Sequence, residues 1–364
     1  MLCRRQFTQL SAAAMASSVV ASSCSTDNNS YGDAVSQIWR HTNIPPANEM
    51  ALQRELVRYA TLAASGHNTQ CWKFQLEDRL ISILPDLERR TPVVDPDDHH
   101  LYASLGCATE NLVQAAKANG LESTVDLGAG ESIKIHLEPA QAVSSPLFEA
   151  IPNRQSTRTD YDGQPLSNEE LKQLEQTATG TGVNLMLLTD KQAMEKVLAY
   201  VIEGNTLQIN DPAFVKELKT WVRFNEKEAV CKGDGLFTKS SGNPTLPQWL
   251  GNRLFGMLLS AESENEKYTH QLRSSAGIAI FVSDQETQAH WIEAGRCYQR
   301  FALQAEALDI RTAFLNQPVE VASLRPQFAT SLGISDYRPD LVVRFGRGPK
   351  MPRSLRRPVG AVIV

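Results

Sequence analysis

This 364-residue sequence lacks an excess of positive charge and lacks long hydrophobic runs after its N-terminus. Its 36 Lys and Arg against 41 Asp and Glu give a net charge of −5, and no long basic stripe stands out. Nucleic-acid binding is therefore a poor first hypothesis. No later stretch approaches the ~18 uninterrupted apolar residues that a membrane-spanning helix needs. An ordinary apolar content of 42% predicts a globular protein with a sizeable core.

Cysteines and short catalytic motifs are also scarce. Five of the six cysteines lie at wide spacings from Cys24 onward, which excludes a disulfide framework and predicts buried or free thiols. Cys-x-x-Cys, His-Glu-x-x-His and Gly-x-Ser-x-Gly are missing, so zinc and serine-hydrolase sites lack their geometry. Acidic residues and histidines gather at 95–100, but acids just before a helix are favoured by capping and the helix dipole. We therefore predict no metal.

The first 24 residues differ from the rest of the chain. Arg4, Arg5 and Phe7 precede a short, weakly apolar stretch of small residues that ends at Cys24. This composition describes an export signal over residues 1–24, and the paired arginines resemble a twin-arginine signal. Ala21-Ser-Ser-Cys24 also resembles a lipoprotein cleavage site, and the alternative is a disordered N-terminus. We expect a protein in the periplasm, or one anchored by lipid at Cys24 and facing the periplasm.

Local patterns predict alternating helices and strands. Leu52, Leu56 and Tyr59 recur at helical spacing, Ser167 to Glu170 has the form of a capping box, and Asp211-Pro212 begins a helix that runs through Trp221. The other predicted segments, in chain order, are a linker with a short docking segment at 25–48, a helix at 49–64, a hairpin at 72–76 and 80–84, a helix at 101–119, a strand at 133–137, a helix ending near 178, strands at 183–188 and 277–282, and a helix at 286–308.

A shift of 189 residues aligns the two long helices. Gly295 falls on Gly106, and Trp291 falls on Tyr102. This agreement predicts a diverged duplication, an α+β fold of two fused halves, 49–150 and 151–364, whose central helices pack so that the chain imitates a homodimer. We expect such a pseudo-dimeric chain to be a monomer. Residues 204–262, rich in Gly, Pro and Ser in their second part, are either a lid over a site or a surface embellishment.

Two polar motifs carry the candidate chemistry. Asn153-Arg-Gln-Ser-Thr-Arg158 places two guanidiniums four residues apart, which suits a phosphate. Ser65 to Trp72 interrupts an apolar run with amides, which suit the polar edge of a flat ring. Flavin mononucleotide (FMN) needs both kinds of site. A solvated basic turn is the alternative for the first motif.

Together these motifs resemble the nitroreductase family, in its Acg-like branch of two fused halves. The likeness extends to Gln317-Pro-Val-Glu320 and to the ending from Arg338, and so covers nearly all of residues 49–360. It implies that FMN is held by the following residues: Ser65, Asn68, Gln70 and Trp72 at the ring, and Arg154, Ser156 and Arg158 at the phosphate, with Arg356 and Arg357 completing the clamp. Only one ring-binding segment is present, so we predict one FMN per chain.

The resemblance implies two-electron transfer through FMN to nitroaromatics, quinones or similar flat small-molecule acceptors. Hydride chemistry belongs to the flavin, so we predict no side chain as catalytic acid or base. Export would separate the protein from cytoplasmic nicotinamide donors, which leaves the electron donor unknown. Two other functions stay open: a non-catalytic protein that sequesters flavin beneath a lid, and a cofactor-free lipoprotein that acts as an interaction module.

Overall fold

The structure is a computed structural model that describes residues 30–42, 46–127 and 132–364. The predicted export signal over residues 1–24 and the lipidation site Cys24 therefore lie outside the described residues. Part of the predicted linker forms helix α1 (Tyr31–Ile38), which a capping box between Ser30 and Asp33 begins. The segment after it docks on the body of the protein, because Trp39 Nε1 donates to the Ser354 carbonyl at 3.0 Å.

The first half of the chain is a four-stranded antiparallel sheet with a long helix. Its strands have the order β1-β2-β4-β3, and β1 and β2 form the predicted hairpin. Asn48 begins the first helix of this half by accepting a hydrogen bond from the Ala51 amide. The elements are α2 (Glu49–Thr61), β1 (Trp72–Glu77), β2 (Leu80–Pro85), α3 (His99–Ala118), β3 (Leu121–Asp126) and β4 (Ile133–Pro139).

The second half repeats this arrangement after the short helix α4 (Pro146–Ala150). Its antiparallel sheet has the order β5-β8-β10-β9, so strand, strand, long helix, strand, strand follow one another with the same spatial order as in the first half. The predicted capping box at Ser167 is confirmed. The elements are α5 (Asn168–Thr177), β5 (Val183–Leu188), β8 (Gly277–Ser283), α11 (Gln288–Ala307), β9 (Arg311–Phe314), α12 (Gln317–Glu320), α13 (Arg325–Ser331) and β10 (Arg338–Gly346).

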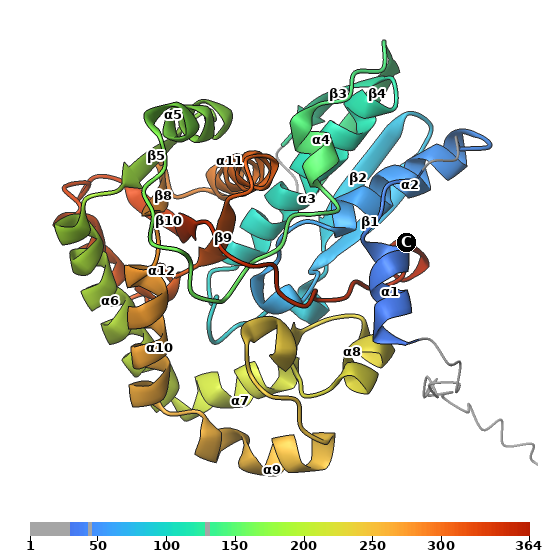
Figure 1. Cartoon of the computed structure of the whole chain (residues 1–364). Coiled ribbons are helices and arrows are strands. Elements are labelled where there is room, and N and C mark those ends of the chain that lie inside the picture. The colour runs from blue at the N-terminus through green and yellow to red at the C-terminus, as the bar shows by residue number, and fades with distance from the viewer. Residues whose placement is uncertain (1–29, 43–45, 128–131) are drawn as a thin grey trace, which may run out of the picture.

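The two long helices pack against each other between the sheets (Figure 1). A Cβ on Gly106 would lie 1.9 Å from the Ile292 carbonyl oxygen, and a Cβ on Gly295 would lie 1.9 Å from that of Ala103. Glycine is therefore needed at both positions. Gly295 and Ile292 follow Gly106 and Ala103 by the same 189 residues, as α11 follows α3. The predicted α+β fold with two similar halves around central helices is confirmed.

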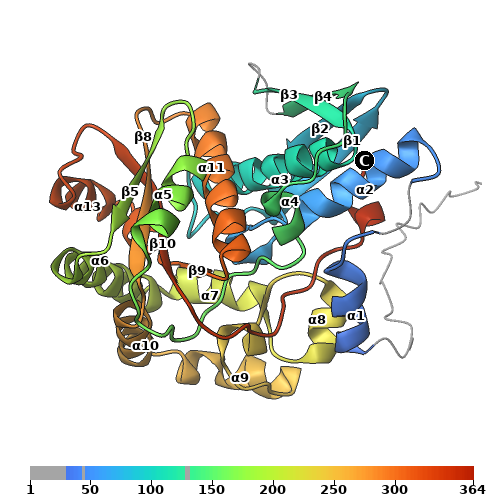
Figure 2. The same cartoon turned by 45° about the horizontal axis from the view of Figure 1, so that its top comes forward.

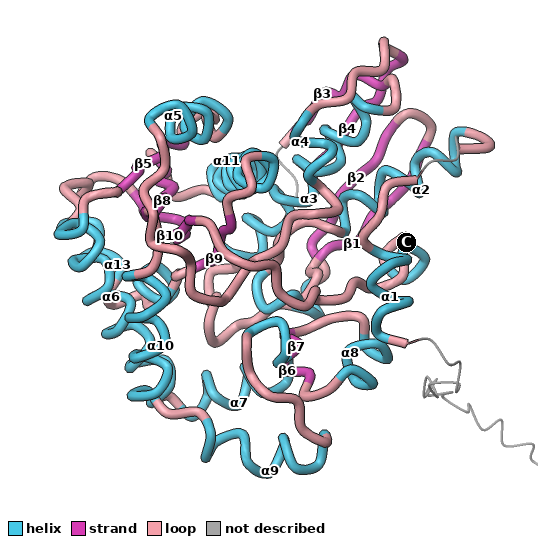
Figure 3. Tube along the Cα trace, in the orientation of Figure 1, coloured by secondary structure: helices cyan, strands magenta, loops and turns pink. Residues whose placement is uncertain are grey.

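A large insertion distinguishes the second half from the first. Two residues, Asp78 and Arg79, connect β1 to β2, whereas residues 189–276 connect β5 to β8. This insertion is mainly helical (Figure 3) and contains the predicted helix that begins at Pro212. It extends beyond the predicted 204–262 at both ends. Its elements are α6 (Lys191–Asn210), α7 (Pro212–Trp221), β6 (Val222–Arg223), α8 (Glu226–Lys232), β7 (Leu236–Phe237), α9 (Gln248–Leu258) and α10 (Ala261–Arg273).

The C-terminal segment crosses from the second half back to the first (Figure 2). Ile363 forms a parallel bridge with Phe74 of β1, and the Phe74 amide donates to the Val362 carbonyl at 2.7 Å. The edge of the first sheet is thus extended by a segment from the other half of the chain. The boundary at residue 150 stays a prediction.

Cysteines and membrane segments were also predicted from the sequence. Cys71, Cys107 and Cys297 are buried and free, as expected. Cys231 is disulfide-bonded, so the prediction of free or merely buried thiols was wrong there. None of the helices that the structure describes is long and apolar enough to cross a membrane.

Candidate functional site

A cavity of about 490 Å³ lies where the two halves and the insertion meet. This volume is in the range of small-molecule and cofactor pockets. Helix α3 contributes the small side chains Ala103, Ser104 and Cys107 to its wall, and the second half contributes Phe314 and Leu341. The insertion adds further apolar side chains: Phe214, Leu218, Val222, Phe224, Leu236, Leu246 and Phe255. The insertion therefore covers the cavity, which favours a lid over a surface embellishment.

The predicted ring-binding loop borders this cavity in a strained conformation. Ser65, Gly66 and His67 line the cavity. His67, Asn68 and Gln70 all have a positive φ, at 47°, 51° and 54°. This left-handed region is uncommon for residues other than glycine, and such conformations persist only where the surrounding structure enforces them. No sequence pattern predicted these left-handed conformations.

Asn68 and Gln70 do not line the cavity but hold the insertion. The Asn68 side-chain amide donates to the Gly235 carbonyl at 3.0 Å, and the Gly235 amide donates back to the Asn68 carbonyl at 3.0 Å. The Gln70 amide donates to the Gly233 carbonyl at 2.9 Å. Between these glycines, Asp234 pairs with Arg223 at 2.7 Å. We call Asn68, Gln70 and residues 233–235 the latch.

The two arginines of the predicted phosphate motif occupy different environments. Arg158 lines the cavity, and among the described residues its guanidinium forms no ion pair with a carboxylate. Burial lowers its pKa, and the nearby tyrosines Tyr268, Tyr298 and Tyr161 oppose this shift. An unpaired cation on the wall of a buried cavity is an anion site.

Arg154 lies outside the cavity wall. Its Nη2 donates to the Leu62 carbonyl at 3.1 Å, whereas its buried Nε and Nη1 have no partner within the described part of the chain. Ser156 forms a parallel bridge with Thr312 of β9, and neither residue is part of the cavity wall. Contacts of Arg154 and Ser156 with a phosphate stay a prediction.

Of the remaining predicted residues, Arg356 and Arg357 have hydrogen-bond partners, whereas the buried Nε1 of Trp72 has none within the described part of the chain. Arg356 donates to the carbonyls of Thr61, Leu62 and Ala63 and so caps the C-terminus of α2. The Arg357 backbone amide donates to Gln70 Oε1 at 2.8 Å. Trp72 is fully buried in β1. The structure thus brings Ser65 and Arg158 to one cavity but engages Asn68, Gln70, Trp72, Arg356 and Arg357 elsewhere.

Other polar groups of the cavity wall were not predicted as site residues. Gln317 lines the cavity, and its buried side-chain oxygen has no partner in the described structure. Lys267 of the insertion also lines it and donates to the Ser241 carbonyl at 3.2 Å and to Asn243 Oδ1 at 3.3 Å. Gln317 lies in a segment that contributed to the family resemblance, which was a usable signal. Lys267 carries no motif, and only the tertiary structure reveals it.

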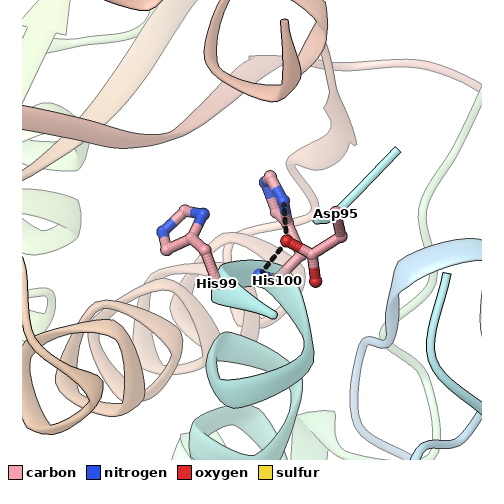
Figure 4. A group of neighbouring side chains, drawn as sticks. All are labelled: Asp95, His99 and His100. Carbon is pink, nitrogen blue, oxygen red and sulfur yellow. Dashed lines mark hydrogen bonds and ion pairs between the residues drawn. The ribbon is translucent and has the colours of Figure 1, made fainter. Parts of the chain in front are cut away.

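Asp95, His99 and His100 lie close together at the start of α3 (Figure 4). Asp95 accepts hydrogen bonds from the backbone amides of His100 and Leu101, each at 2.9 Å, so both carboxylate oxygens cap the helix. His99 Nε2 is directed to Asp340 at 2.9 Å. The Asp95 contacts agree with the predicted capping of this helix, and His99 takes part in a buried hydrogen bond.

The face of α11 that corresponds to the cavity wall of α3 is filled by ion pairs. Adding 189 to Ser104 and Cys107 gives Glu293 and Arg296, which pair with each other at 3.0 Å. Arg300 pairs with Glu293 at 3.0 Å and with the buried Glu110 of α3 at 2.7 Å. Charged side chains thus occupy the pseudo-equivalent position, in agreement with a single site per chain.

Comparisons with known proteins point to one family. No family model matches the chain. The chain is 25% identical over 341 residues to the protein named "Putative NAD(P)H nitroreductase Rv3131" from Mycobacterium tuberculosis, over 89% of this chain and 93% of that protein. It is 23% identical over 322 residues to "Putative NAD(P)H nitroreductase acg" of the same species, over 85% and 94%. This similarity supports the nitroreductase family.

Solved structures show weaker likeness. The FMN-dependent nitroreductase NfnB from Mycobacterium smegmatis, in complex with NADPH, matches with a TM-score of 0.40 and 12% identity, over 59% of this chain and 96% of that one. A nitroreductase with bound FMN from Desulfitobacterium hafniense matches with a TM-score of 0.38 and 16% identity, over 59% and 95%. At TM-scores this low we draw no conclusion about this chain from them.

Proposed function

We propose that this chain is an FMN-dependent oxidoreductase of the nitroreductase type that passes two electrons to flat acceptors such as quinones or nitroaromatics. The observation that carries the proposal is the cavity between the two halves, which is lined both by Ser65 and by Arg158, a cation without a carboxylate partner among the described residues. Whole-length similarity to proteins named nitroreductases supports it.

The side chains of the cavity fit FMN in chemical terms. Apolar groups of α3 and the insertion suit the faces of a planar ring, and the free oxygen of Gln317 and the hydroxyl of Ser65 suit its polar edge. Arg158 and Lys267 would hold the phosphate, because both line the cavity and among the described residues the partners of Lys267 are neutral and the groups near Arg158 are tyrosines. When bound, FMN supplies hydride chemistry, and the chain orients it and excludes water.

The closed insertion gives a specific reason to keep the second candidate function. The latch holds residues 233–235 against the loop at 68–70, and the insertion forms much of the cavity wall. A lid that stays closed would make the protein a store of flavin without turnover. A lid that opens would admit donor and acceptor.

We also propose that the protein is exported through the predicted signal at residues 1–24. Its electron donor is then either NAD(P)H or a membrane quinol.

The decisive experiment is a visible spectrum of the purified protein, followed by release and mass measurement of any cofactor. We expect a yellow protein whose flavin bleaches with dithionite and reoxidises with a quinone. Colourless protein after expression with ample flavin contradicts the proposal and favours an interaction module. Bound flavin that acceptors reach only after removal of residues 204–262 favours sequestration.

Arg158→Ala tests the phosphate assignment. Loss of a charged hydrogen bond costs about 1 to 3 kcal/mol, so the dissociation constant for FMN should rise about 5- to 150-fold. Arg253→Ala removes an exposed arginine of α9 and is the matched control. Because Arg154 does not line the cavity, Arg154→Ala should weaken binding less than Arg158→Ala. Unchanged FMN retention in Arg158→Ala removes the assignment.

A further inference from the structure

One side chain of the cavity wall, His100, is positioned to act as a proton donor. His100 lines the cavity at the start of α3, with 12% of its side chain exposed. Its Nδ1 lies 3.4 Å from Asp95 Oδ1 (Figure 4). Its Nε2 is buried and has no hydrogen-bond partner in the described part of the chain. A carboxylate thus holds one ring nitrogen, and the other is left for a group that the chain does not supply.

The charges around His100 favour the imidazolium. Burial alone would lower the pKa of His100, but its hydrogen bond to Asp95, the charge of Asp95 and the charge of Glu320 together raise it. Arg325 opposes this effect. The other titratable groups that interact with His100 are His67, His99 and Asp340.

His67, the neighbouring histidine of the loop, has a lowered pKa, whereas that of His100 is raised. Burial, Arg158 and His100 lower the pKa of His67 to about 4, so this ring is neutral when His100 is charged. His67 also lines the cavity. The wall therefore carries one ring that can donate a proton and one that cannot.

We propose that His100 is the acid that protonates a quinone acceptor as it is reduced, with Asp95 as its positioning residue. This inference rests on the proposed function. When bound and reduced, FMN would supply a hydride, and a quinone that took it up would gain two electrons and become a hydroquinone monoanion. The His100 Nε2–H bond then breaks, an O–H bond forms on the anionic oxygen, and the neutral imidazole regains a proton from water.

Reoxidation kinetics with two acceptors isolate this step. Dithionite-reduced wild type, His100→Gln and His136→Gln would be mixed with 1,4-benzoquinone or with ferricyanide, which takes electrons singly and needs no proton. His136 is an exposed histidine of β4 and provides the matched control. A general acid contributes about 100-fold or more, so His100→Gln should slow benzoquinone reduction about 100-fold and leave ferricyanide unchanged. The rate of benzoquinone reduction by His100→Gln should also lose the pH dependence that the wild type shows.

A second readout does not depend on turnover. NMR titration of the histidine rings in the wild-type protein should give His100 a pKa above the ordinary histidine value of about 6.5, and Asp95→Asn should lower it. A His100 that titrates at or below the ordinary value of about 6.5 overturns the proposal, as does equal quinone reduction by His100→Gln and wild type. Wild-type protein without flavin, or with flavin that quinones do not reoxidise, overturns the proposed function and this inference together. Flavin content measured for each variant distinguishes the two failures.

Discussion

The latch gives the sharpest test of how the cavity opens. In the double variant Asn68→Ala/Gln70→Ala, residues 233–235 lose both side-chain amides that bind them. A single hydrogen bond contributes about 1 kcal/mol net, so the closed state should lose about 2 kcal/mol. This difference raises the equilibrium constant for opening about 30-fold. The increase of about 30-fold is a lower bound, because the buried carbonyls of Gly233 and Gly235 also lose their hydrogen-bond donors.

Amide hydrogen exchange of the insertion measures this opening directly. In the FMN-free double variant, we expect amides of α7 and α8 to exchange about 30-fold faster than in the wild type, with exchange in β8 unchanged. The control Asn184→Ala/Gln176→Ala removes the same two residue types from exposed positions on β5 and α5. It should leave exchange in the insertion unaltered.

The family resemblance implies a different role for Asn68 and Gln70, namely contact with the flavin ring. If Asn68 and Gln70 are ring contacts and no latch, the double variant loses FMN affinity while exchange in the FMN-free insertion stays at the wild-type rate. That result refutes the latch. Faster exchange throughout the protein also refutes it, because the substitutions would then have lowered global stability and not lid closure.

Three further predictions test the packing and the charges. Gly106→Ala would place a Cβ within 1.9 Å of a carbonyl oxygen of α11, so urea unfolding should show a loss of about 3 kcal/mol, whereas Gly256→Ala, with nothing within 4 Å, should stay within about 0.5 kcal/mol of wild type. Burial would raise the pKa of Asp97, but the hydrogen bond and charge of Arg338 lower it from 3.8 to about 2. The ionised Asp97 therefore contributes to the free energy of unfolding above pH 3.8, and this contribution is lost as the pH falls through about 2. Asp97→Asn should lower the free energy of unfolding by about 1 kcal/mol near neutral pH and match wild type near pH 2. Purified protein should bind one FMN per chain by absorbance, and two per chain would contradict the reading of α11 as a filled face.

Local rules recovered most of the secondary structure. Side-chain caps at Asn48, Ser167 and Asp211 begin three predicted helices, because capping depends on residues only a few positions apart. The duplication was visible as well, since two helices that must cross at close range each need a small residue at the crossing. Gly106 and Gly295 meet this need. The larger extent of the insertion was not predicted, although Asp190 and Ser260 cap α6 and α10 with their side chains, because such caps indicate where a helix begins and not which unit of the fold it belongs to.

The sequence by itself determined the helices and strands, the repeat and the two polar motifs that suit a flavin. Only the tertiary structure decided which side chains of those motifs face the cavity. Arg158 and Ser65 do, while Asn68 and Gln70 turn to backbone carbonyls more than 160 residues away. The physical reason is that a motif fixes the kinds of hydrogen-bonding groups present, whereas the direction of each group follows from whichever buried donor or acceptor must be satisfied nearby.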